Sequence, residues 1–337
     1  MKINAFATLK QQNYLTKYHY QIQSQDHAVV VQIYYCGLCR SDIHFMQNTW
    51  GDSIYPLVPG HEILGKIISI GDKVPKHYLH KKVAIAWQQS ACGKCYYCQQ
   101  QQENHCQKIQ AIGIGSHGGF ADYIQTNYNF VHIVPEQFFC PQLAPLLCAG
   151  TTVYNAMQKL SIQKNMRIAV IGIGGIGHLA IKFLTALKCH VLACTHPKTD
   201  NNTILSLGAK VAIHSDDINR LKKYSHSYDA LFLSTDAKID LSLFIQLLKP
   251  QAKLAILAMP KVIEIPSLDL IVKEISIIGI QAGNKENVAK TLEFAYIHNI
   301  QAEIKQMAMK DINLAINLQN QQYPPYYRIV LCNEITN

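Results

Sequence analysis

The pattern of hydrophobic and polar positions changes character near residue 150. Before that point, short apolar segments are separated by turn signals such as Gly71-Asp72. The clearest segments are VVVQIYYCG (29–37), ILGKIISIGDKV (63–74) and KKVAIAW (81–87). Short strand-like runs bounded by turn residues predict a β-rich, barrel-like domain.

After residue 150, helical stretches alternate with apolar strand-like runs. The series is RIAVIGI (167–173), GHLAIKFLTALK (177–188), HVLACT (190–195), DALFLST (229–235) and KLAILAM (253–259). This rhythm predicts an α/β domain with a doubly wound parallel sheet that helices cover on both faces. A helix from Val288 to His298 and a final strand-like YRIVLC (327–332) should return to the β-rich domain. The expected domains are therefore residues 1–150 with 286–337, and residues 151–285.

Composition supports two globular domains. The chain has 337 residues, of which 49% are hydrophobic, and this fraction permits a sizeable core. No apolar run reaches the roughly 18 residues that a membrane span needs. The first residues, MKINAFATLKQQNY, lack the apolar segment of a signal peptide. We therefore expect a cytoplasmic protein with no membrane partner.

The net charge of +9 raises the possibility of a nucleic-acid partner. The 31 Lys and Arg residues are scattered, however, and the tightest groups are pairs such as Lys81-Lys82. Because the charges form no basic patch, we expect no nucleic-acid binding. A modest positive field would also suit a phosphate-bearing cofactor. A zinc-dependent regulatory or nucleic-acid-binding protein remains the alternative from another functional class.

Four of the 11 cysteines form a compact motif, ACGKCYYCQQQQENHC. In a chain without an export signal, such a cluster favours metal binding over disulfides. Four thiolates with C-x2-C-x2-C-x7-C spacing can close a tetrahedron, which is the arrangement of a structural zinc site. An iron–sulfur cluster is the main competitor, but its usual C-x2-C-x2-C-x3-C-Pro pattern is absent. The predicted structural zinc ligands are Cys92, Cys95, Cys98 and Cys106.

A glycine motif follows the apolar strand that begins at Arg167. Its four glycines are Gly172, Gly174, Gly175 and Gly177, and a helix-like segment follows directly. In this strand–turn–helix context, G-x-G-x-x-G indicates a dinucleotide site, where the backbone approaches a pyrophosphate at a helix N-terminus.

A second group of metal-binding residue types is spread along the chain. Cys36 and Cys39 form a C-x2-C pair, His61-Glu62 follows a Pro-Gly turn, and Cys148 lies in APLLCAG. Two thiolates and one imidazole would leave one zinc position open, as in a catalytic site. Spacing alone does not decide between Cys36 and Cys39. A surface histidine and buried apolar cysteines are the structural alternatives.

These residues resemble the zinc-dependent medium-chain alcohol dehydrogenases, and most closely their cinnamyl-alcohol-dehydrogenase-like group. The matching segments are CGLCRSDIH (36–44), YPLVPGHEILG (55–65), the cysteine motif, APLLCAGTTVY (144–154), VIGIGGIGHLAIK (170–182) and YRIVLCN (327–333). The resemblance covers essentially the full length. It implies a GroES-like catalytic domain that carries both zinc sites, a Rossmann domain, an active site in the cleft between them, and a homodimer.

The resemblance also implies roles for individual residues. The catalytic zinc ligands would be Cys39, His61 and Cys148, with Glu62 as a carboxylate that transiently replaces substrate or water. Asp42 would orient a ligand imidazole, Ser41 and His44 would form a proton relay, and Arg40 would reach the cofactor pyrophosphate. The other cysteines (Cys36, Cys140, Cys189, Cys194 and Cys332) would be core residues.

The expected reaction is the interconversion of a primary alcohol, aryl or medium-chain, and its aldehyde. A polyol or secondary-alcohol dehydrogenase of the same superfamily is the alternative; Ser41 with His44 favours the primary-alcohol activity. For the cofactor, the second strand of the α/β domain ends in Thr195-His196-Pro197-Lys198 without an acid. NAD-specific domains place an Asp or Glu there, so we expect NADP(H) in preference to NAD(H), with Thr195, His196 and Lys198 at the 2′-phosphate. Asp200 departs from the group, which usually has a basic residue at that position.

Overall fold

The computed structural model describes residues 1–321 and 324–334, which form two compact units. The first comprises Met1–Cys148, Gly283–Ile297 and the chain from Gln301 onward. The second comprises Ala149–Ala282 and the short segment His298–Ile300. Within the described ranges, no helix combines the length and apolarity that crossing a bilayer would require.

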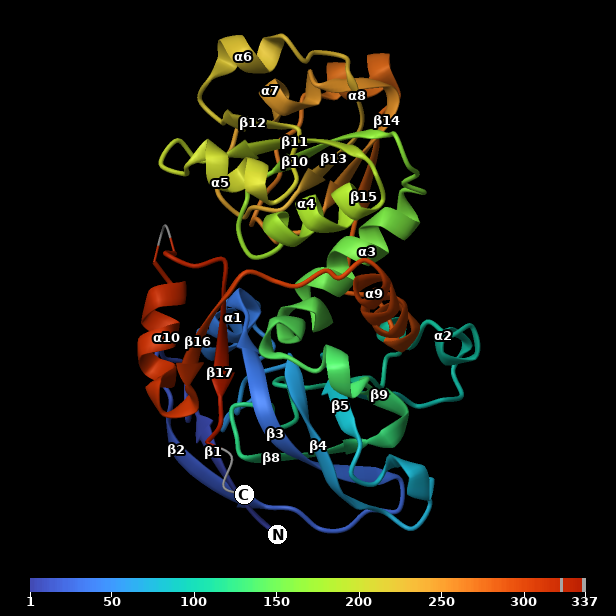
Figure 1. Cartoon of the computed structure of the whole chain (residues 1–337), viewed down its shortest axis with the longest axis vertical. Coiled ribbons are helices and arrows are strands. Elements are labelled where there is room, and N and C mark those ends of the chain that lie inside the picture. Colours follow the sequence, from blue (N-terminus) through green and yellow to red (C-terminus); the bar gives the residue numbers. More distant parts are fainter. Residues whose placement is uncertain (322–323, 335–337) are drawn as a thin grey trace. The chain divides into compact units, whose positions relative to one another are not determined.

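A seven-stranded mixed sheet forms the frame of the first unit (Figure 1). Its order is β16-β17-β3-β4-β5-β9, with β8 also paired to β3, and all pairs except β16–β17 are antiparallel. These strands are β3 (Ala28–Leu38), β4 (Ile63–Ile70), β5 (Lys82–Ile85), β8 (Tyr123–Asn127), β9 (Val131–Ile133), β16 (Ile304–Ala308) and β17 (Arg328–Cys332). Two small antiparallel pairs join β1 (Lys2–Ala7) to β2 (Thr16–Gln21) and β6 (Gln88–Ser90) to β7 (Gln110–Ala111).

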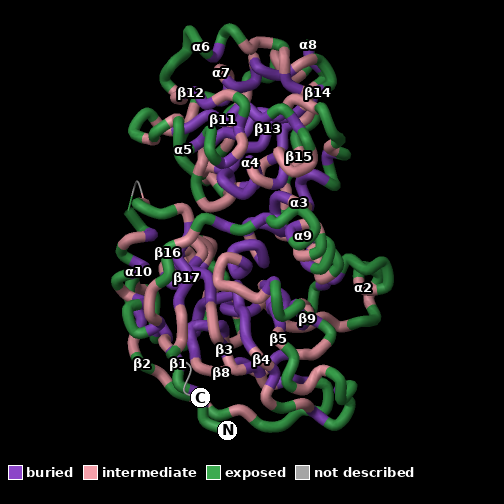
Figure 2. The backbone as a smooth tube through the Cα atoms, viewed as in Figure 1, coloured by how far each residue is buried: buried purple, intermediate pink, exposed green. Residues whose placement is uncertain are grey.

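Strand β3 shows why this sequence builds a sheet with a buried face. Val29, Val31 and Ile33 are buried. Gln32 and Tyr34, which point to the other face of the strand, are only partly buried. β-Branched residues at alternating positions pack well on a pleated surface that is covered on one side. Most of β3 and the first half of β4 are buried (Figure 2). The helices of this unit are α1 (Arg40–Met46), α2 (Tyr96–Gln99), α9 (Lys285–Ile297) and α10 (Ile312–Gln319).

The second unit is a six-stranded, fully parallel sheet with helices between successive strands. The strand order is β12-β11-β10-β13-β14-β15. Its strands are β10 (Arg167–Ile171), β11 (His190–Thr195), β12 (Val211–His214), β13 (Tyr228–Leu233), β14 (Leu248–Ile256) and β15 (Ser276–Gly279). Its helices are α3 (Ala149–Lys159), α4 (Gly177–Ala186), α5 (Asn201–Ser206), α6 (Ile218–Lys222), α7 (Leu241–Ile245) and α8 (Ser267–Lys273). The chain winds outward from β10 in one direction and then from β13 in the other, which is the Rossmann arrangement.

The predicted fold class is therefore confirmed, with differences in detail. The helix predicted from Val288 begins earlier, at Lys285, and ends at Ile297. Strands β15 and β16 were not predicted. Both are short: β15 has four residues and is largely exposed, and β16 is only partly buried, with Lys305 and Gln306 at its centre. Cys36, Cys189 and Cys194 are buried as expected, but the expectation is wrong for Cys140 and Cys332, which are only partly buried.

Candidate functional site

Four side chains of the first unit converge at the ends of β3 and β4. Cys39 follows β3, His61 and Glu62 precede β4, and Cys148 follows a short 3-10 helix, Pro141–Leu147. One possible ligand atom from each lies within 4.8 Å of the others. Two thiols, an imidazole and a carboxylate at this separation are a donor set suited to zinc. Cys36 does not join them: its thiol is fully buried in the apolar core, so the choice that spacing left open falls on Cys39.

Asp42 fixes this group from the first turn of α1. Its Oδ1 accepts hydrogen bonds from His61 Nδ1 and from the Gly60 backbone N–H, both at 2.9 Å. Its Oδ2 accepts from the Cys39 backbone N–H, also at 2.9 Å. Since His61 donates through Nδ1, its Nε2 is the nitrogen left to bind a metal. Burial opposes charging of His61, but the carboxylate of Asp42 outweighs it and raises the pKa of the imidazole above its ordinary value.

Glu62 forms a buried ion pair with Arg328, the first residue of β17. Arg328 Nη2 donates to Oε2 at 2.6 Å and also to Oε1, and both residues are almost inaccessible to solvent. Burial raises the pKa of Glu62 to about 7, although Arg328 acts in the opposite direction. Arg328 was not among the site residues predicted from the sequence. The signal was present, because an arginine at the start of an otherwise apolar strand needs a buried partner.

The two residues of the predicted proton relay lie on α1. Ser41 Oγ is 3.6 Å from Cys39 Sγ, so its hydroxyl lies beside the metal-ligand group. His44 is one turn further along, where its Nδ1 lies 3.4 Å from Thr49 Oγ1. The imidazole ring also packs against Trp50, with ring centroids 5.0 Å apart. An aromatic side chain therefore lies next to the histidine of the predicted relay.

The four-cysteine motif forms a separate group in the same unit. The sulfurs of Cys92, Cys95, Cys98 and Cys106 all lie within 4.8 Å of one another, and Cys92 and Cys98 are 3.9 Å apart. Four thiolates around one zinc at the usual Zn–S length of about 2.3 Å would be about 3.8 Å apart. Backbone N–H groups of Lys94 and Cys95 lower the pKa of Cys92 to about 6, which favours the thiolate, whereas burial raises the pKa of Cys98. The group therefore fits a structural zinc.

The glycine motif forms the turn between β10 and α4. Gly172 has a φ of +86°, which a residue with a side chain rarely adopts. A Cβ on Gly177 would lie 2.1 Å from the Gly172 carbonyl oxygen, whereas one on Gly174 would meet nothing within 4 Å. The turn thus needs glycine for its tight bend and for close packing, and it leaves open space at its tip, as in a pyrophosphate-binding turn.

The other predicted cofactor residues lie at the end of β11, apart from Arg40, which begins α1 in the first unit. Thr195 is the last, buried residue of β11, and His196 Nδ1 accepts a hydrogen bond from the Lys198 backbone N–H at 3.2 Å. Asp200 caps α5, where its carboxylate accepts from the backbone N–H groups of Asn202 and Thr203. That carboxylate is therefore engaged in stabilising a helix.

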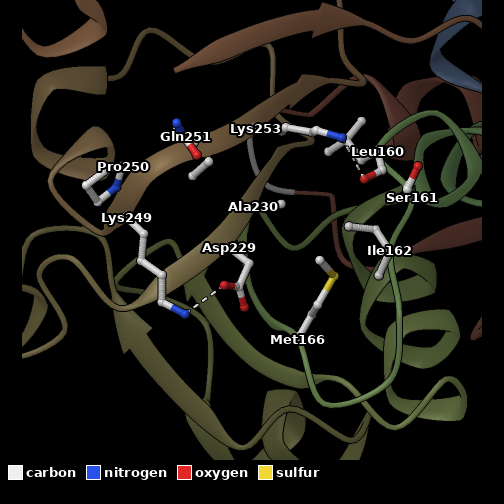
Figure 3. A pocket seen from close by; sticks show the side chains of 11 residues that line it. Leu160, Ser161, Ile162, Met166, Asp229, Ala230, Lys249, Pro250, Gln251 and Lys253 are labelled. Carbon is white, nitrogen blue, oxygen red and sulfur yellow. Dashed lines mark hydrogen bonds and ion pairs between the residues drawn. The ribbon is translucent and has the colours of Figure 1, made fainter. Parts of the chain in front are cut away.

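A cavity of about 260 Å³ lies elsewhere in the second unit, and Figure 3 shows the side chains that line it. It lies at the amino ends of the strands, beside Asp229 near the start of β13 and Met166 just before β10. Asp229 already pairs with Lys249 Nζ at 2.7 Å and accepts from the Arg167 backbone N–H. Because dinucleotides bind at the carboxyl ends of such strands, this cavity is separate from the glycine turn.

Comparison with known proteins agrees with these features. The sequence-family model of the alcohol dehydrogenase GroES-like domain matches residues 25–136, and that of the zinc-binding dehydrogenase matches residues 175–296. An aldehyde reductase, AdhA, from Synechocystis is 30% identical over 332 residues, which are 98% of each chain.

Two solved structures share the whole architecture. A cinnamyl alcohol dehydrogenase from Sorghum bicolor is 27% identical with a TM-score of 0.93, and the match covers 100% of both chains. A cinnamyl alcohol dehydrogenase from Helicobacter pylori, solved with NADP(H), is 25% identical with a TM-score of 0.91 over 98% of both chains.

Proposed function

The chain belongs to the medium-chain zinc-binding alcohol dehydrogenase family, in its cinnamyl-alcohol-dehydrogenase-like group, and from this we propose that it interconverts primary alcohols and aldehydes with NADP(H). The observation that supports the proposal most is the convergence of Cys39, His61 and Cys148 beside Glu62. Three ligands of this kind leave one position of a tetrahedral zinc for substrate, which distinguishes a catalytic site from a structural one.

In this proposal the catalytic zinc is held by Cys39, His61 and Cys148, and the structural zinc by the four-cysteine group. When bound, the catalytic ion acts as a Lewis acid, which polarises the substrate oxygen and lowers the pKa of an alcohol. Asp42 keeps the His61 ring in place and in the correct tautomer. Arg328 balances the charge of Glu62, so that a carboxylate can remain beside the ligands in a buried position.

Ser41 and His44 move the proton. Ser41 Oγ lies beside Cys39 Sγ, where it accepts the alcohol proton and releases its own hydroxyl proton toward His44. His44, one helical turn away and partly exposed, exchanges the proton with water. In aldehyde reduction the direction is reversed, and His44 supplies the proton that Ser41 delivers. Trp50, which packs on His44, offers an apolar surface for an aryl or medium-chain group.

The glycine turn would hold the pyrophosphate, and the end of β11 would select the cofactor. A 2′-phosphate carries negative charge that the threonine, histidine and lysine there can accommodate and that an acid would repel. Asp200 does not oppose this assignment, because its carboxylate is used to cap α5. The cinnamyl alcohol dehydrogenase from Helicobacter pylori was solved with NADP(H), which supports binding of this cofactor by the group.

The test is a panel of aryl and medium-chain aldehydes and alcohols, with a polyol and a secondary alcohol included, followed by nicotinamide absorbance. We expect primary substrates and NADPH to give the highest kcat/KM. Lys198→Ala should lower kcat/KM for NADPH roughly tenfold and leave NADH unaffected, because a charged hydrogen bond is lost. Lys210→Ala, an exposed lysine before β12, is the matched control. A preference for NADH, or for the polyol, would contradict the corresponding part of the proposal.

A further inference from the structure

A glycine in β3 lies between the two partners of the buried ion pair. β3 pairs with β4 on one side and with β17 on the other. Gly37 is directly opposite Val330 of β17, and its backbone N–H donates to the Glu62 carbonyl oxygen at 2.9 Å. Glu62 and Arg328 therefore stand on opposite sides of the strand that contains Gly37.

All three residues face the same side of the sheet. The residues next to them along their strands, Ile63, Cys36, Leu38 and Ile329, belong to the apolar core of the unit. Side chains alternate between the two faces of a strand. Glu62, Gly37 and Arg328 consequently share the opposite face, where Glu62 also meets the metal ligands.

The ion pair has to cross β3. Neighbouring strands are about 4.8 Å apart, so the backbones of Glu62 and Arg328 are separated by roughly twice that distance. Their side chains nevertheless approach to 2.6 Å. A Cβ on Gly37 would lie 2.0 Å from Glu62 Oε2 and 3.0 Å from Glu62 Cδ, and its three nearest atoms all belong to Glu62. The carboxylate therefore occupies the space that any side chain at position 37 would fill.

We propose that Gly37 is a positioning residue for Glu62: the empty space above β3 lets the carboxylate reach Arg328 and keeps it at a fixed position beside the metal ligands. A side chain at position 37 would displace the carboxylate from this space. Glu62 Oε lies within 4.8 Å of the donor atoms of Cys39, His61 and Cys148, so displacement would alter its relation to a bound metal. The proposal rests on the proposed zinc chemistry of this group.

The first test compares wild type, Gly37→Ala and a matched control. Gly279→Ala adds a methyl group to another strand glycine, where it would meet nothing within 4 Å. Each protein is prepared with cobalt(II) at the catalytic site, whose visible absorption reports the number and kind of ligands. We expect Gly37→Ala to change this spectrum and to lower kcat/KM for aldehyde reduction at least tenfold, and Gly279→Ala to change neither.

The second test asks whether Gly37 acts through Glu62. Residues that act through one contact are strongly non-additive in a double-mutant cycle. In a Glu62→Ala background the carboxylate is gone. There, adding Gly37→Ala should leave the cobalt spectrum unchanged and change kcat/KM less than twofold. The same result is expected in folding: if Gly37→Ala alone does not fold, Gly37→Ala with Glu62→Ala should fold as well as Glu62→Ala.

Two outcomes would overturn the proposal. One is a folded Gly37→Ala protein with the spectrum and kcat/KM of wild type. The other is an equal loss in both backgrounds, in kcat/KM or in folding, which would make Gly37 a structural residue only. The failure of the proposed function looks different: wild type would then reduce no aldehyde, while the cobalt spectra would still report the contact between position 37 and Glu62.

Discussion

At the level of residues, a single carboxylate organises the candidate metal-binding group of Cys39, His61, Glu62 and Cys148. Asp42 accepts three hydrogen bonds, and all three come from the ligand segments: the backbone of Cys39, the backbone of Gly60 and the ring of His61. Both carboxylate oxygens are therefore used. A side-chain amide of the same shape has only one oxygen, and its NH₂ group would face an N–H donor.

Asp42→Asn should therefore weaken metal binding without unfolding the protein. Loss of a group that orients a ligand histidine typically costs about 10–100-fold in metal affinity or activity. Dialysis against a chelator, followed by metal analysis and kcat/KM, measures both effects, and the exposed Asp52→Asn is the control. If Asp42→Asn retained zinc as tightly as wild type, the hydrogen bonds to His61 would have no role in holding the metal.

The sequence predicted part of this residue-level arrangement. Motif positions brought Cys39, His61, Glu62, Cys148 and Asp42 together as candidates, because the family resemblance links segments that lie far apart in the chain. Spacing alone could not show whether Cys36 or Cys39 is the candidate metal ligand. The structure separates them, because the Cys36 side chain on β3 points into the apolar core. Arg328 was missed because its partner is 266 residues away. No local pattern encodes a pairing across β3.

At the level of elements, the four-cysteine loop is the part of the first unit that most needs a metal. Its helical segments are short, α2 of four residues and a 3-10 turn at Glu103–His105. It is tied to the start of α9 by Lys285, which pairs with Glu103 at 3.2 Å, and by Asn284, which donates to the Gln101 carbonyl oxygen. Few apolar contacts hold such a loop, so its order should depend on the zinc.

Cys92→Ser should therefore lower the stability of the fold more than the catalytic activity, and Cys148→Ser should lower the activity more than the stability. We expect Cys92→Ser to reduce the melting temperature by several degrees and Cys148→Ser to leave it nearly unchanged while removing almost all activity. Metal analysis should find two zincs in wild type and one in each variant. A full complement of two zincs in a Cys39→Ser, Cys148→Ser double variant would disprove the assignment of the two sites.

The level of elements is also where the sequence was most informative. The buried strands β3, β10, β11 and β13 were visible because their apolar runs are long, and the glycine turn gave the start of α4. The partly exposed strand β16 has a polar centre, and the largely exposed β15 is only four residues long. Their pairing depends on neighbours that are distant in sequence, β17 and β14, and local propensity does not determine it.

For the whole molecule, the sequence predicted two folding units and the return of the C-terminal segment to the first. The rhythm of strands and helices carries this information, because parallel strands need crossover connections. Helices join all successive strands of the second unit, whereas in the described part of the first unit only β16 and β17 form such a pair, with α10 between them. The number of subunits, unlike the number of folding units, is not encoded in this rhythm. It depends on which surfaces remain uncovered, and the resemblance alone suggested a homodimer.

One surface of the second unit is suited to such a contact. Leu268, Ile271 and Val272 of α8 are 70–74% exposed, and their spacing places them on one helix face. Met259 and Val262, just before α8, are 68% and 73% exposed. Large apolar side chains gathered in one segment mark an interaction surface. A twofold contact would bring the same surface of two copies together.

If the expected homodimer forms through this surface, Ile271→Asp should convert it to a monomer. In a twofold interface the substitution appears twice, and each copy would bury an unpaired carboxylate, which weakens association at least tenfold. Sedimentation velocity at micromolar protein concentration measures the change. Leu9→Asp, at a residue that is 56% exposed in the first unit, should leave the dimer intact. A wild-type protein that sediments as a monomer would contradict the homodimer. A dimer that survives Ile271→Asp unchanged would place the interface elsewhere.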